Sequence, residues 1–501
     1  MFSLEQFKKI DFGHSSAQAE ARENPELLTK GFLDGHNIAN KISNGRQWLI
    51  LGYKGSGKSA IAEHLRLINE EDPLSFINIV NVEDFEYIRF TEMAKSSEAL
   101  QTALPITWAW IIYSYMLNSF FKDNGLKTSN EEHFFQIKES FSKMGLSPVY
   151  DLNTIVRISS ETNFKLIAPK FAEKSWIQKK DPGELDLRWY INNLKPFISE
   201  IRSESKHFLI IDGLDDIFTN KEEQYESITA LIYEVARIND FLRKNSSPGK
   251  VIVLCRTDIF ELLGGANKNK IRQDYSIDLD WNSNPRSPEK SPLVAIGNIR
   301  GNVSLENKIN VINDFFPKKY ERKITLKSIL DMTRHTPRDY LRLLSYLQEH
   351  ATSVPMHPDD ISNAMRQYSS KYFLPEIHDE LHGYASLQEI KGIMLAIESI
   401  SKRDFSFDEI LQSSKSSSTE IGLIDLEKLL MALYECSAIG NVRIHKKFQG
   451  KRFLSFKYRN RTSSFKKDER IILHRGLWKA FNIQWEPFSR DIDPDVSNDE
   501  A

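Results

Sequence analysis

The chain has 501 residues, more than one compact hydrophobic core usually holds, so two or three domains are expected. Hydrophobic residues make up 40% and charged residues 27%, a composition typical of soluble globular proteins that excludes global disorder. The 67 basic and 69 acidic side chains give a net charge of −2, so any nucleic-acid-binding surface has to be local.

The first predicted structural unit runs from a strand through a loop into a helix. Apolar residues 48–51 precede a glycine-rich turn, and Ile61, Leu65 and Ile68 then share one helical face. The turn and the start of the helix, GYKGSGKS, match the phosphate-loop pattern G-x-x-x-x-G-K-S. The residues expected to hold the phosphates of ATP are Gly52, Tyr53, Lys54, Gly55, Ser56, Gly57, Lys58, Ser59 and Ala60.

The chemistry of this loop depends on its backbone and on two side chains. Glycines let backbone N–H groups turn toward phosphate oxygens at a helix N-terminus, where unpaired donors and the helix dipole favour an anion. Lys58 is expected to reach the β- and γ-phosphates, and the Ser59 hydroxyl to ligate Mg²⁺. The alternative is a glycine-rich loop whose lysine has no role.

Further extended segments follow in chain order. FINIVNVEDFEYI is followed by a mostly helical region over about 90–200, then by HFLIIDGLDDIF and KVIVLCRTDIF. Short apolar runs flanked by helices predict central parallel strands, with polar residues at the carboxyl ends where such sheets bind ligands. The expected fold class is therefore α/β, a parallel-sheet P-loop NTPase core.

The predicted strand 207–212 ends in a carboxylate, and two more follow it closely in the sequence. Asp212 is positioned to hold hydrated Mg²⁺. The run LIIDGLDD resembles the Walker B form of the signal-transduction ATPases with numerous domains (STAND) rather than that of AAA proteins. That resemblance implies that Asp215 orients or activates the attacking water, with Asp216 as the reserve.

Two arginines are candidate sensors of the γ-phosphate. Arg256 follows the strand VIVLC, and this position is often Arg in STAND-like and origin-recognition-like ATPases; the alternative is a surface ion pair. Arg338 lies in HTPRD, where Thr336 as N-cap and a proline at N1 explain a helix start by themselves. The same segment resembles the second sensor of this ATPase class, whereas His335 is expected to be structural.

The uncharged stretch between Glu98 and Lys122 is long enough to be a candidate membrane span. A single crossing would separate the two halves of the nucleotide site, so we expect a buried aromatic helix and no membrane contact. The start of the chain has no apolar core of signal-peptide length, and the two cysteines, Cys255 and Cys436, cannot form a disulfide framework. A cytoplasmic protein with a buried, unreactive Cys255 is expected.

After about residue 300 the strand signal fades. We predict an N-terminal segment near the nucleotide base (1–45), the ATPase core (46–300), a helical lid (301–375), a winged-helix-like domain (376–483) and a disordered acidic tail (484–501). Between Arg443 and Arg475 twelve Lys or Arg stand against Asp468 and Glu469. Such a wing could bind DNA or RNA phosphates, or be a solvated hairpin, or be docked on the acidic part of its own chain.

These motifs, with the stretch NKIRQDYSIDLDW and the ending HRGLWKAF, together resemble a bacterial family of P-loop ATPases near the STAND and origin-recognition branches, some of whose relatives occur in anti-phage defence loci. The similarity runs from about Asp11 to Phe481, and it implies that residues 11–34 line the adenine pocket. The function expected is a slow ATPase acting as a molecular switch through a protein partner or self-association. The alternatives are a DNA-binding ATPase related to replication initiators and a small-molecule P-loop kinase.

Overall fold

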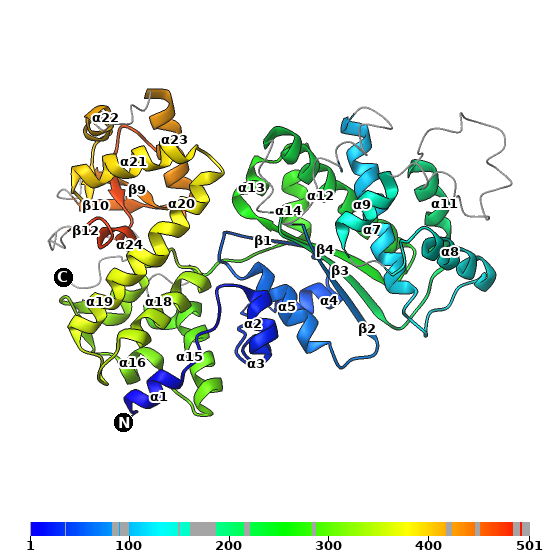
Figure 1. Cartoon of the computed structure of the whole chain (residues 1–501), viewed down its shortest axis with the longest axis horizontal. Helices are drawn as coiled ribbons and strands as arrows, with labels where there is room; N and C mark the ends of the chain where they lie inside the picture. The colour runs from blue at the N-terminus through cyan, green and yellow to red at the C-terminus, as the bar shows by residue number, and fades with distance from the viewer. Residues whose placement is uncertain are drawn as a thin grey trace. The chain divides into compact units, whose positions relative to one another are not determined.

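The computed structural model describes residues 2–35, 37–82, 90, 100–148, 151–160, 187–214, 221–282, 287–416, 423–445, 451–483 and 491–492 (Figure 1). Contacts divide the chain into two compact units. The sheet unit comprises His36–Lys54 and Lys58–Leu279, and the terminal unit comprises Met1–Gly35, Gly55–Gly57 and Asp280–Ala501. Each unit is described by itself below.

The sheet unit is built on five parallel strands, which confirms the predicted α/β class. The strands are β1 (Leu49–Gly52), β2 (Ser75–Asn81), β3 (Lys206–Asp212), β4 (Gly249–Arg256) and β5 (Ser276–Asp278). Their order is β2-β3-β4-β1-β5, so β4 lies between the strand that leads into the phosphate loop and the strand that ends in Asp212.

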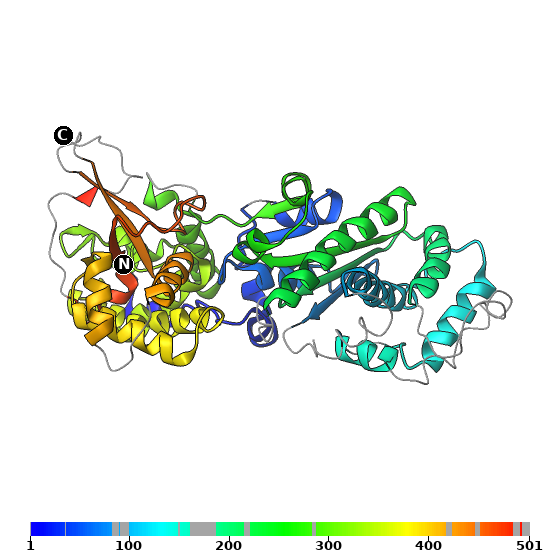
Figure 2. The same ribbon diagram turned by 90° about the horizontal axis from the view of Figure 1, so that it is seen from above.

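Both faces of this sheet are covered, as near-continuous apolar strands require. Successive side chains alternate between faces, so Leu49 and Leu51 join one hydrophobic core while Ile50 is buried outside it. That core contains α7 (Leu100–Phe120), α11 (Leu187–Glu200) and α12 (Lys221–Lys244), whereas α5 (Lys58–Ile68) contacts β1, β2 and β4 from the other side (Figures 1 and 2). The other helices of the unit are α4 (Ile38–Asn44), α8 (Glu131–Lys143), α9 (Leu152–Ser160), α13 (Thr257–Leu262) and α14 (Lys268–Tyr275).

Helix α7 is the uncharged stretch that resembled a membrane span. Trp108, Trp110 and Tyr113 on it are at most 2% exposed and belong to the core of the sheet unit. The Trp108 indole N–H donates to the Ser227 carbonyl at 3.1 Å, and that of Trp110 donates to the hydroxyl of Ser159 at 2.8 Å. The prediction of a buried aromatic helix is confirmed, and within the described ranges no helix is long and apolar enough to cross a membrane.

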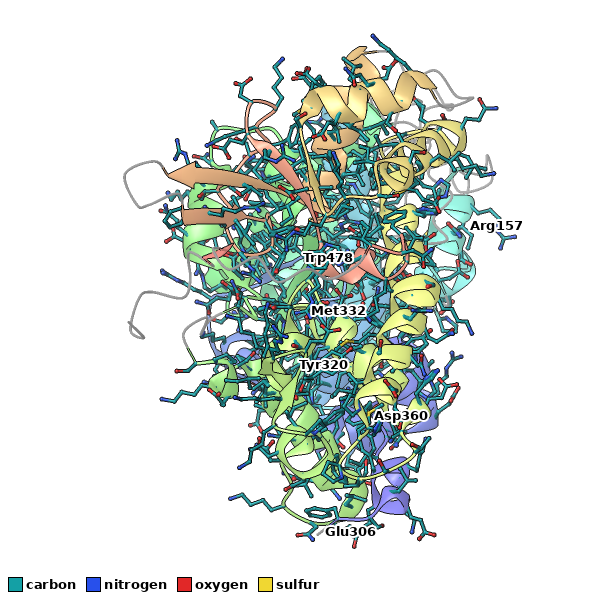
Figure 3. All side chains as sticks on the ribbon, turned by 90° about the vertical axis from the view of Figure 1, so that its left-hand side faces the viewer. Arg157, Glu306, Tyr320, Met332, Asp360 and Trp478 are labelled. Atoms are coloured by element: carbon teal, nitrogen blue, oxygen red, sulfur yellow. The ribbon has the colours of Figure 1, made fainter. Side chains whose placement is uncertain are left out.

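The terminal unit is mostly helical (Figure 3). Its longer helices are α15 (Pro292–Leu305), α18 (Pro337–His350), α19 (Pro358–Tyr368), α20 (Leu374–His382), α21 (Leu387–Ile400), α22 (Phe407–Ser416) and α23 (Leu423–Glu435). Its shorter ones are α1 (Leu4–Lys9), α2 (Ala17–Glu23), α3 (Pro25–Thr29), α16 (Val311–Phe315), α17 (Thr325–Leu330) and α24 (Arg475–Trp478).

A second sheet lies in this unit after the helices α21 to α23. Its strands are β8 (Asp404–Phe405), β9 (Ile439–His445), β10 (Lys451–Ser455), β11 (Arg470–Leu473) and β12 (Asp491–Ile492). The order is β12-β10-β9-β11-β8, with β9 antiparallel to both β10 and β11. The segment thus contains the three helices and the antiparallel hairpin that the sequence pattern predicted there, and also β8, β11 and β12, which it did not predict.

One buried core runs through most of the terminal unit, from Phe7 to Phe481, and includes Tyr320 and Met332 (Figure 3). Phe7 stacks on Phe315 with ring centroids 4.7 Å apart, which fixes the start of the chain to this unit. The finer division into a lid (301–375) and a separate domain (376–483) stays a prediction. The predicted disordered tail lies outside the described residues, apart from β12.

Candidate nucleotide-binding site

The phosphate loop joins the end of β1 to the start of α5. Gly55 and Gly57 adopt φ values of +78° and +93°, a left-handed conformation that side chains rarely allow, so glycine is required at both positions. At Gly55 an added Cβ would also lie 3.1 Å from the Cβ of Arg338. The loop therefore has the backbone that a phosphate cradle needs, directly before the eleven-residue helix α5.

Lys58 is the first residue of α5, and its side chain points back toward the loop. The amine donates to the carbonyls of Gly52 at 3.2 Å and Tyr53 at 3.4 Å, and the residue is only 6% exposed. The hydroxyl of Ser56 is buried and has no hydrogen-bond partner among the described residues. A buried ammonium, an unsatisfied hydroxyl and left-handed glycines fit a polyphosphate, because each offers donors to an anion.

The carboxyl ends of three neighbouring strands bring further polar groups to the same edge of the sheet. Arg256 at the end of β4 pairs in register with Gly52 at the end of β1. Asp212 ends β3, the strand beyond β4, where it is 6% exposed and accepts a hydrogen bond from the Gly213 amide at 2.9 Å. The loop, the arginine and the carboxylate therefore follow one another along this edge of the sheet.

The residues of this edge can also be tested as a magnesium site. Mg²⁺ usually takes one or two carboxylates together with phosphate oxygens and water, so Asp212 with the Ser59 hydroxyl fits that requirement. Among the described residues no three His, Cys, Asp or Glu side chains cluster as a preformed metal site. Asp215 and Asp216, the candidates for positioning water, lie outside the described residues.

Arg256 makes a buried ion pair with Asp258. Its Nε and Nη2 donate to the two carboxylate oxygens at 3.0 and 2.6 Å, and each side chain is 11% exposed. Burial alone would raise the pKa of Asp258, but the guanidinium of Arg256 outweighs it and holds that pKa below its usual range. An ion pair on the surface was the alternative role of Arg256 in the sequence analysis. Arg256 does form an ion pair, but that pair is buried.

Helix α18 begins as the sequence predicts. The hydroxyl of Thr336 accepts from the Asp339 amide at 3.2 Å, and Pro337 occupies N1. The backbone N–H of Arg338 donates to the Gly55 carbonyl at 3.3 Å, while its guanidinium lies 3.9 Å from the carboxylate of Glu376. The terminal unit thus includes the tip of the phosphate loop, Gly55–Gly57, as well as Arg338.

His335 precedes that helix start and has a structural role. Its backbone is left-handed at φ +53°, and its Nδ1 lies 3.0 Å from the side-chain oxygen of Asn282. The ring also lies 5.2 Å from that of Tyr458, measured between centroids. Cys255 is likewise fully buried, as expected of a small apolar side chain.

Sequence reasoning missed a buried charge network behind α18. Arg334 donates to Asp339 at 3.0 Å and to Glu380 of α20 at 2.6 Å, and the Tyr372 hydroxyl donates to Asp339 at 3.0 Å. Burial opposes ionisation of Asp339, but Arg334 keeps its pKa below the usual range. Asp339 stands at N3 of α18, and the arginine five positions earlier in the sequence was the signal that could have predicted the network.

The basic segment 443–475 is largely neutralised within the terminal unit. Each of the nine Lys or Arg whose side chains are described there lies within 4.0 Å of a carboxylate: 443, 452, 457, 459, 461, 466, 467, 470 and 475. Arg452, for example, is bound to Asp404 at 2.8 Å and is 10% exposed. Positions 446 and 447 lie outside the described residues, as does the side chain at 451.

The sheet order, the glycine conformations and the loop before α5 define an α/β P-loop nucleotide-binding core. No protein-family model matches the chain. A curated relative, the putative transposon gamma-delta 80.3 kDa protein of Escherichia coli K12, is 21% identical over 95% of this chain and 67% of its own length. The chain thus spans about two thirds of that protein.

Two solved structures are similar at a greater distance. Cdc6p from Pyrobaculum aerophilum aligns with 94% of this chain and 95% of its own, at 14% identity and a TM-score of 0.32. A Walker-type ATPase of Pyrococcus abyssi aligns with 90% of this chain and 95% of its own, at 12% identity and a TM-score of 0.38. These likenesses are too distant for function to be transferred from them.

Proposed function

We propose that this chain binds and slowly hydrolyses ATP as a STAND-like molecular switch that acts through a protein partner or self-association. The observation that carries the proposal is the carboxyl edge of the sheet, where the phosphate loop, Arg256 and Asp212 follow one another on β1, β4 and β3. A setting in anti-phage defence rests on the family resemblance alone and belongs to the same proposal.

Each residue has a defined part in this mechanism. The amides of the loop bind the phosphates, and Lys58 places its ammonium against the β- and γ-phosphate oxygens. Ser59 and Asp212 would hold Mg²⁺, which when bound would neutralise charge on those oxygens. Asp215, with Asp216 as the reserve, orients the attacking water and accepts its proton.

The ion pair of Arg256 with Asp258 gives the switch a two-state element. Asp258 holds two of the three donor nitrogens of the guanidinium, Nε and Nη2, at hydrogen-bond distance. A γ-phosphate carries more negative charge than a carboxylate, so it can draw the guanidinium away from Asp258. ADP lacks that group, so Arg256 would report specifically on the ATP state. Arg338 is proposed as the second sensor.

A protein face is favoured over a nucleic-acid face in the winged-helix-like segment. Counterion release on DNA binding requires Lys and Arg that are free to contact phosphates. The nine described basic residues of the segment already face carboxylates, so each would have to exchange one anion for another. A DNA-binding ATPase is therefore the alternative function, and the experiment described next distinguishes it from the switch.

The test measures ATP hydrolysis with and without duplex DNA, together with the mass in solution with ADP and with a non-hydrolysable ATP analogue. We expect slow hydrolysis that DNA leaves unchanged, and a change of shape or assembly with the ATP analogue alone. The Lys58→Ala variant is the control for contaminating ATPase. Phosphate transfer to a small molecule would favour a kinase, and identical scattering profiles in all nucleotide states would refute the switch.

The nucleic-acid question has its own variant. Arg452 is buried against Asp404, so neutralising it would damage the fold as well as the surface. Arg443, Lys466 and Lys467 are more than half exposed and can be changed to Gln with little effect on folding. Salt-sensitive DNA binding by the intact protein that is lost in this triple variant would overturn the protein-face proposal.

A further inference from the structure

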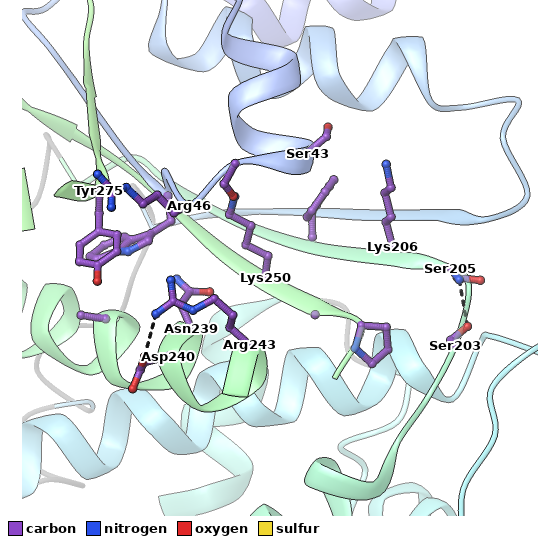
Figure 4. Close-up of a pocket in the computed structure, with 16 residues that line it drawn as sticks. Ser43, Arg46, Ser203, Ser205, Lys206, Asn239, Asp240, Arg243, Lys250 and Tyr275 are labelled. Carbon is purple, nitrogen blue, oxygen red and sulfur yellow. Dashed lines mark hydrogen bonds and ion pairs between the residues drawn. The ribbon is translucent and has the colours of Figure 1, made fainter. Parts of the chain in front are cut away.

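A cavity of about 390 Å³ lies at the amino edge of the sheet, within the sheet unit (Figure 4). Its walls come from the residues that precede β1, from the starts of β3 and β4, from the last turns of α12 and from the end of α14. Nucleotides bind such sheets at the opposite, carboxyl edge. The cavity therefore belongs to a different site from the one described above, and its volume falls in the range of roughly 300–1,000 Å³ of small-molecule pockets.

The charged lining is strongly asymmetric. Four cationic side chains, Arg46, Lys206, Arg243 and Lys250, face one carboxylate, Asp240. That carboxylate is already engaged, since Arg243 lies 2.9 Å and Lys244 2.7 Å from its oxygens (Figure 4). The charged groups of the lining thus carry an excess of positive charge, which favours an anion.

Part of this positive charge has a structural explanation. Helices α4 and α12 both end at this edge, and cations near a helix C-terminus offset its exposed carbonyls. Lys250 does so directly, because its amine donates to the carbonyls of Ile42 and Gly45. Burial also lowers the pKa of Lys250 to about 8, a cost that a neighbouring anion would relieve.

The helix C-termini do not explain the positive charge that Arg46 and Lys206 bring to the cavity. Arg46 has only a long contact, 3.7 Å, to Asp274, and its side chain is 59% exposed. The Lys206 amine lies 3.5 Å from the side-chain oxygen of Asn44, at the limit of a hydrogen bond. Both side chains reach the cavity from different elements, so both can turn to a ligand at little cost in existing interactions.

The uncharged part of the lining is mixed: it includes the apolar or aromatic side chains of Trp48, Phe208, Ala236, Pro248 and Tyr275, and the polar ones of Ser43, Ser203, Ser205 and Asn239. The rings of Trp48 and Tyr275 are nearly parallel, at 27°, with centroids 6.1 Å apart. Flat aromatic walls beside cationic side chains suit a ligand that combines a planar apolar body with an anionic group.

We propose that this cavity binds a small organic anion, with its phosphate or carboxylate held by the cationic side chains of the lining, Arg46 and Lys206 among them, and a planar apolar body lying against Tyr275. Phosphate and carboxylate present the same negatively charged oxygens to these donors. The site is independent of the proposed ATP site, so either proposal can fail without the other.

Isothermal titration calorimetry with three matched probes tests the proposal: 1-naphthyl phosphate, 2-naphthoate and neutral 2-naphthol. We expect at least one of the two anions to bind, and the neutral probe to bind at least about tenfold more weakly because it lacks the charge-assisted hydrogen bonds. The Lys58→Ala variant should bind the anions as the wild type does, which excludes the phosphate loop as their site. Which anion binds more tightly distinguishes a phosphate ligand from a carboxylate ligand.

Two variants then locate the binding site. Arg46→Gln with Lys206→Gln should weaken binding at least about fivefold, because two partly exposed charge contacts are lost. The matched control, Arg237→Gln with Lys143→Gln, removes two exposed cations of the same unit that do not line the cavity and should change affinity less than about twofold.

Ala236→Phe tests the location without changing charge, since the larger ring should occupy the cavity and abolish binding. Circular dichroism checks that each variant is folded. No binding of either anion at millimolar concentration would overturn the proposal. Equal binding of the neutral probe, or full affinity in the Arg46 and Lys206 double variant, would overturn it as well.

Discussion

Replacing Lys58 by Ala is the most direct test of the phosphate loop. The residue is 6% exposed, and without nucleotide its amine donates to two carbonyls at 3.2 and 3.4 Å, which are long for hydrogen bonds. In the variant, alanine, the best helix former, would occupy the first position of α5. Loss of the two weak bonds and gain in helix propensity offset each other, so we expect the free energy of unfolding to change by no more than about 1 kcal/mol.

The effect on ATP binding is expected to be much larger. A hydrogen bond to a charged group contributes about 1.5–3 kcal/mol, and Lys58 would make at least one such bond to the phosphates. At about 1.4 kcal/mol for each factor of ten, losing it weakens ATP binding by about 10- to 150-fold. Hydrolysis should fall below detection, because the same ammonium neutralises charge that develops during phosphoryl transfer.

Calorimetric titration of Mg·ATP into the wild type and the variant measures this difference, with thermal unfolding recorded in parallel. Lys143→Ala is the matched control, since it removes an exposed lysine of the same unit that is paired only with Glu139 on its own helix. A normal unfolding transition with unchanged ATP affinity in Lys58→Ala would refute the assignment of this loop as the nucleotide site. An unfolded variant would instead show that the two carbonyl contacts stabilise the fold by more than about 1 kcal/mol.

Four further variants probe the neighbouring carboxylates. Asp215→Asn should keep Mg·ATP affinity and slow turnover by about 10²- to 10⁴-fold, as loss of a general base does; an inactive Asp216→Asn beside an active Asp215→Asn would move the assignment by one residue. Asp212→Asn should raise the Mg²⁺ concentration needed for half-maximal turnover, and an unchanged metal titration would count against it. Because the folded-state pKa of Asp258 is lowered, its stabilisation is present above the unfolded value of about 3.9 and is lost as the pH falls toward the folded-state pKa. Asp258→Asn should remove that acid-dependent part and cost about 3–5 kcal/mol at pH 7, as removing one partner of a buried ion pair does, and equal denaturant midpoints in the two proteins would contradict this.

Local patterns predicted the elements that carry the site. The apolar run before GYKGSGKS became β1, the runs ending in Asp212 and Arg256 became β3 and β4, and HTPRD became the start of α18 with Thr336 as its cap. These features depend on residues a few positions apart, through strand burial, glycine φ values and capping, so the sequence alone determined them. The ion pair of Arg256 is also local, since its partner Asp258 is only two residues away in the sequence.

Only the tertiary structure determined which carboxylates the basic side chains pair with. The basic segment 443–475 was open to nucleic acid in the sequence, but Asp331, Asp404 and Glu435 reach it from distant positions and pair with its Arg and Lys side chains. The insertion of β4 between β1 and β3, and the cavity at the amino edge, also join segments far apart in the chain. Hydrophobic periodicity encodes which side of an element is buried, but not which distant element covers it. Packing therefore determined the strand order and the ion pairs. Burial of apolar surface selects one arrangement of the elements, and that arrangement places particular acidic and basic side chains at the edge of the core close enough to pair.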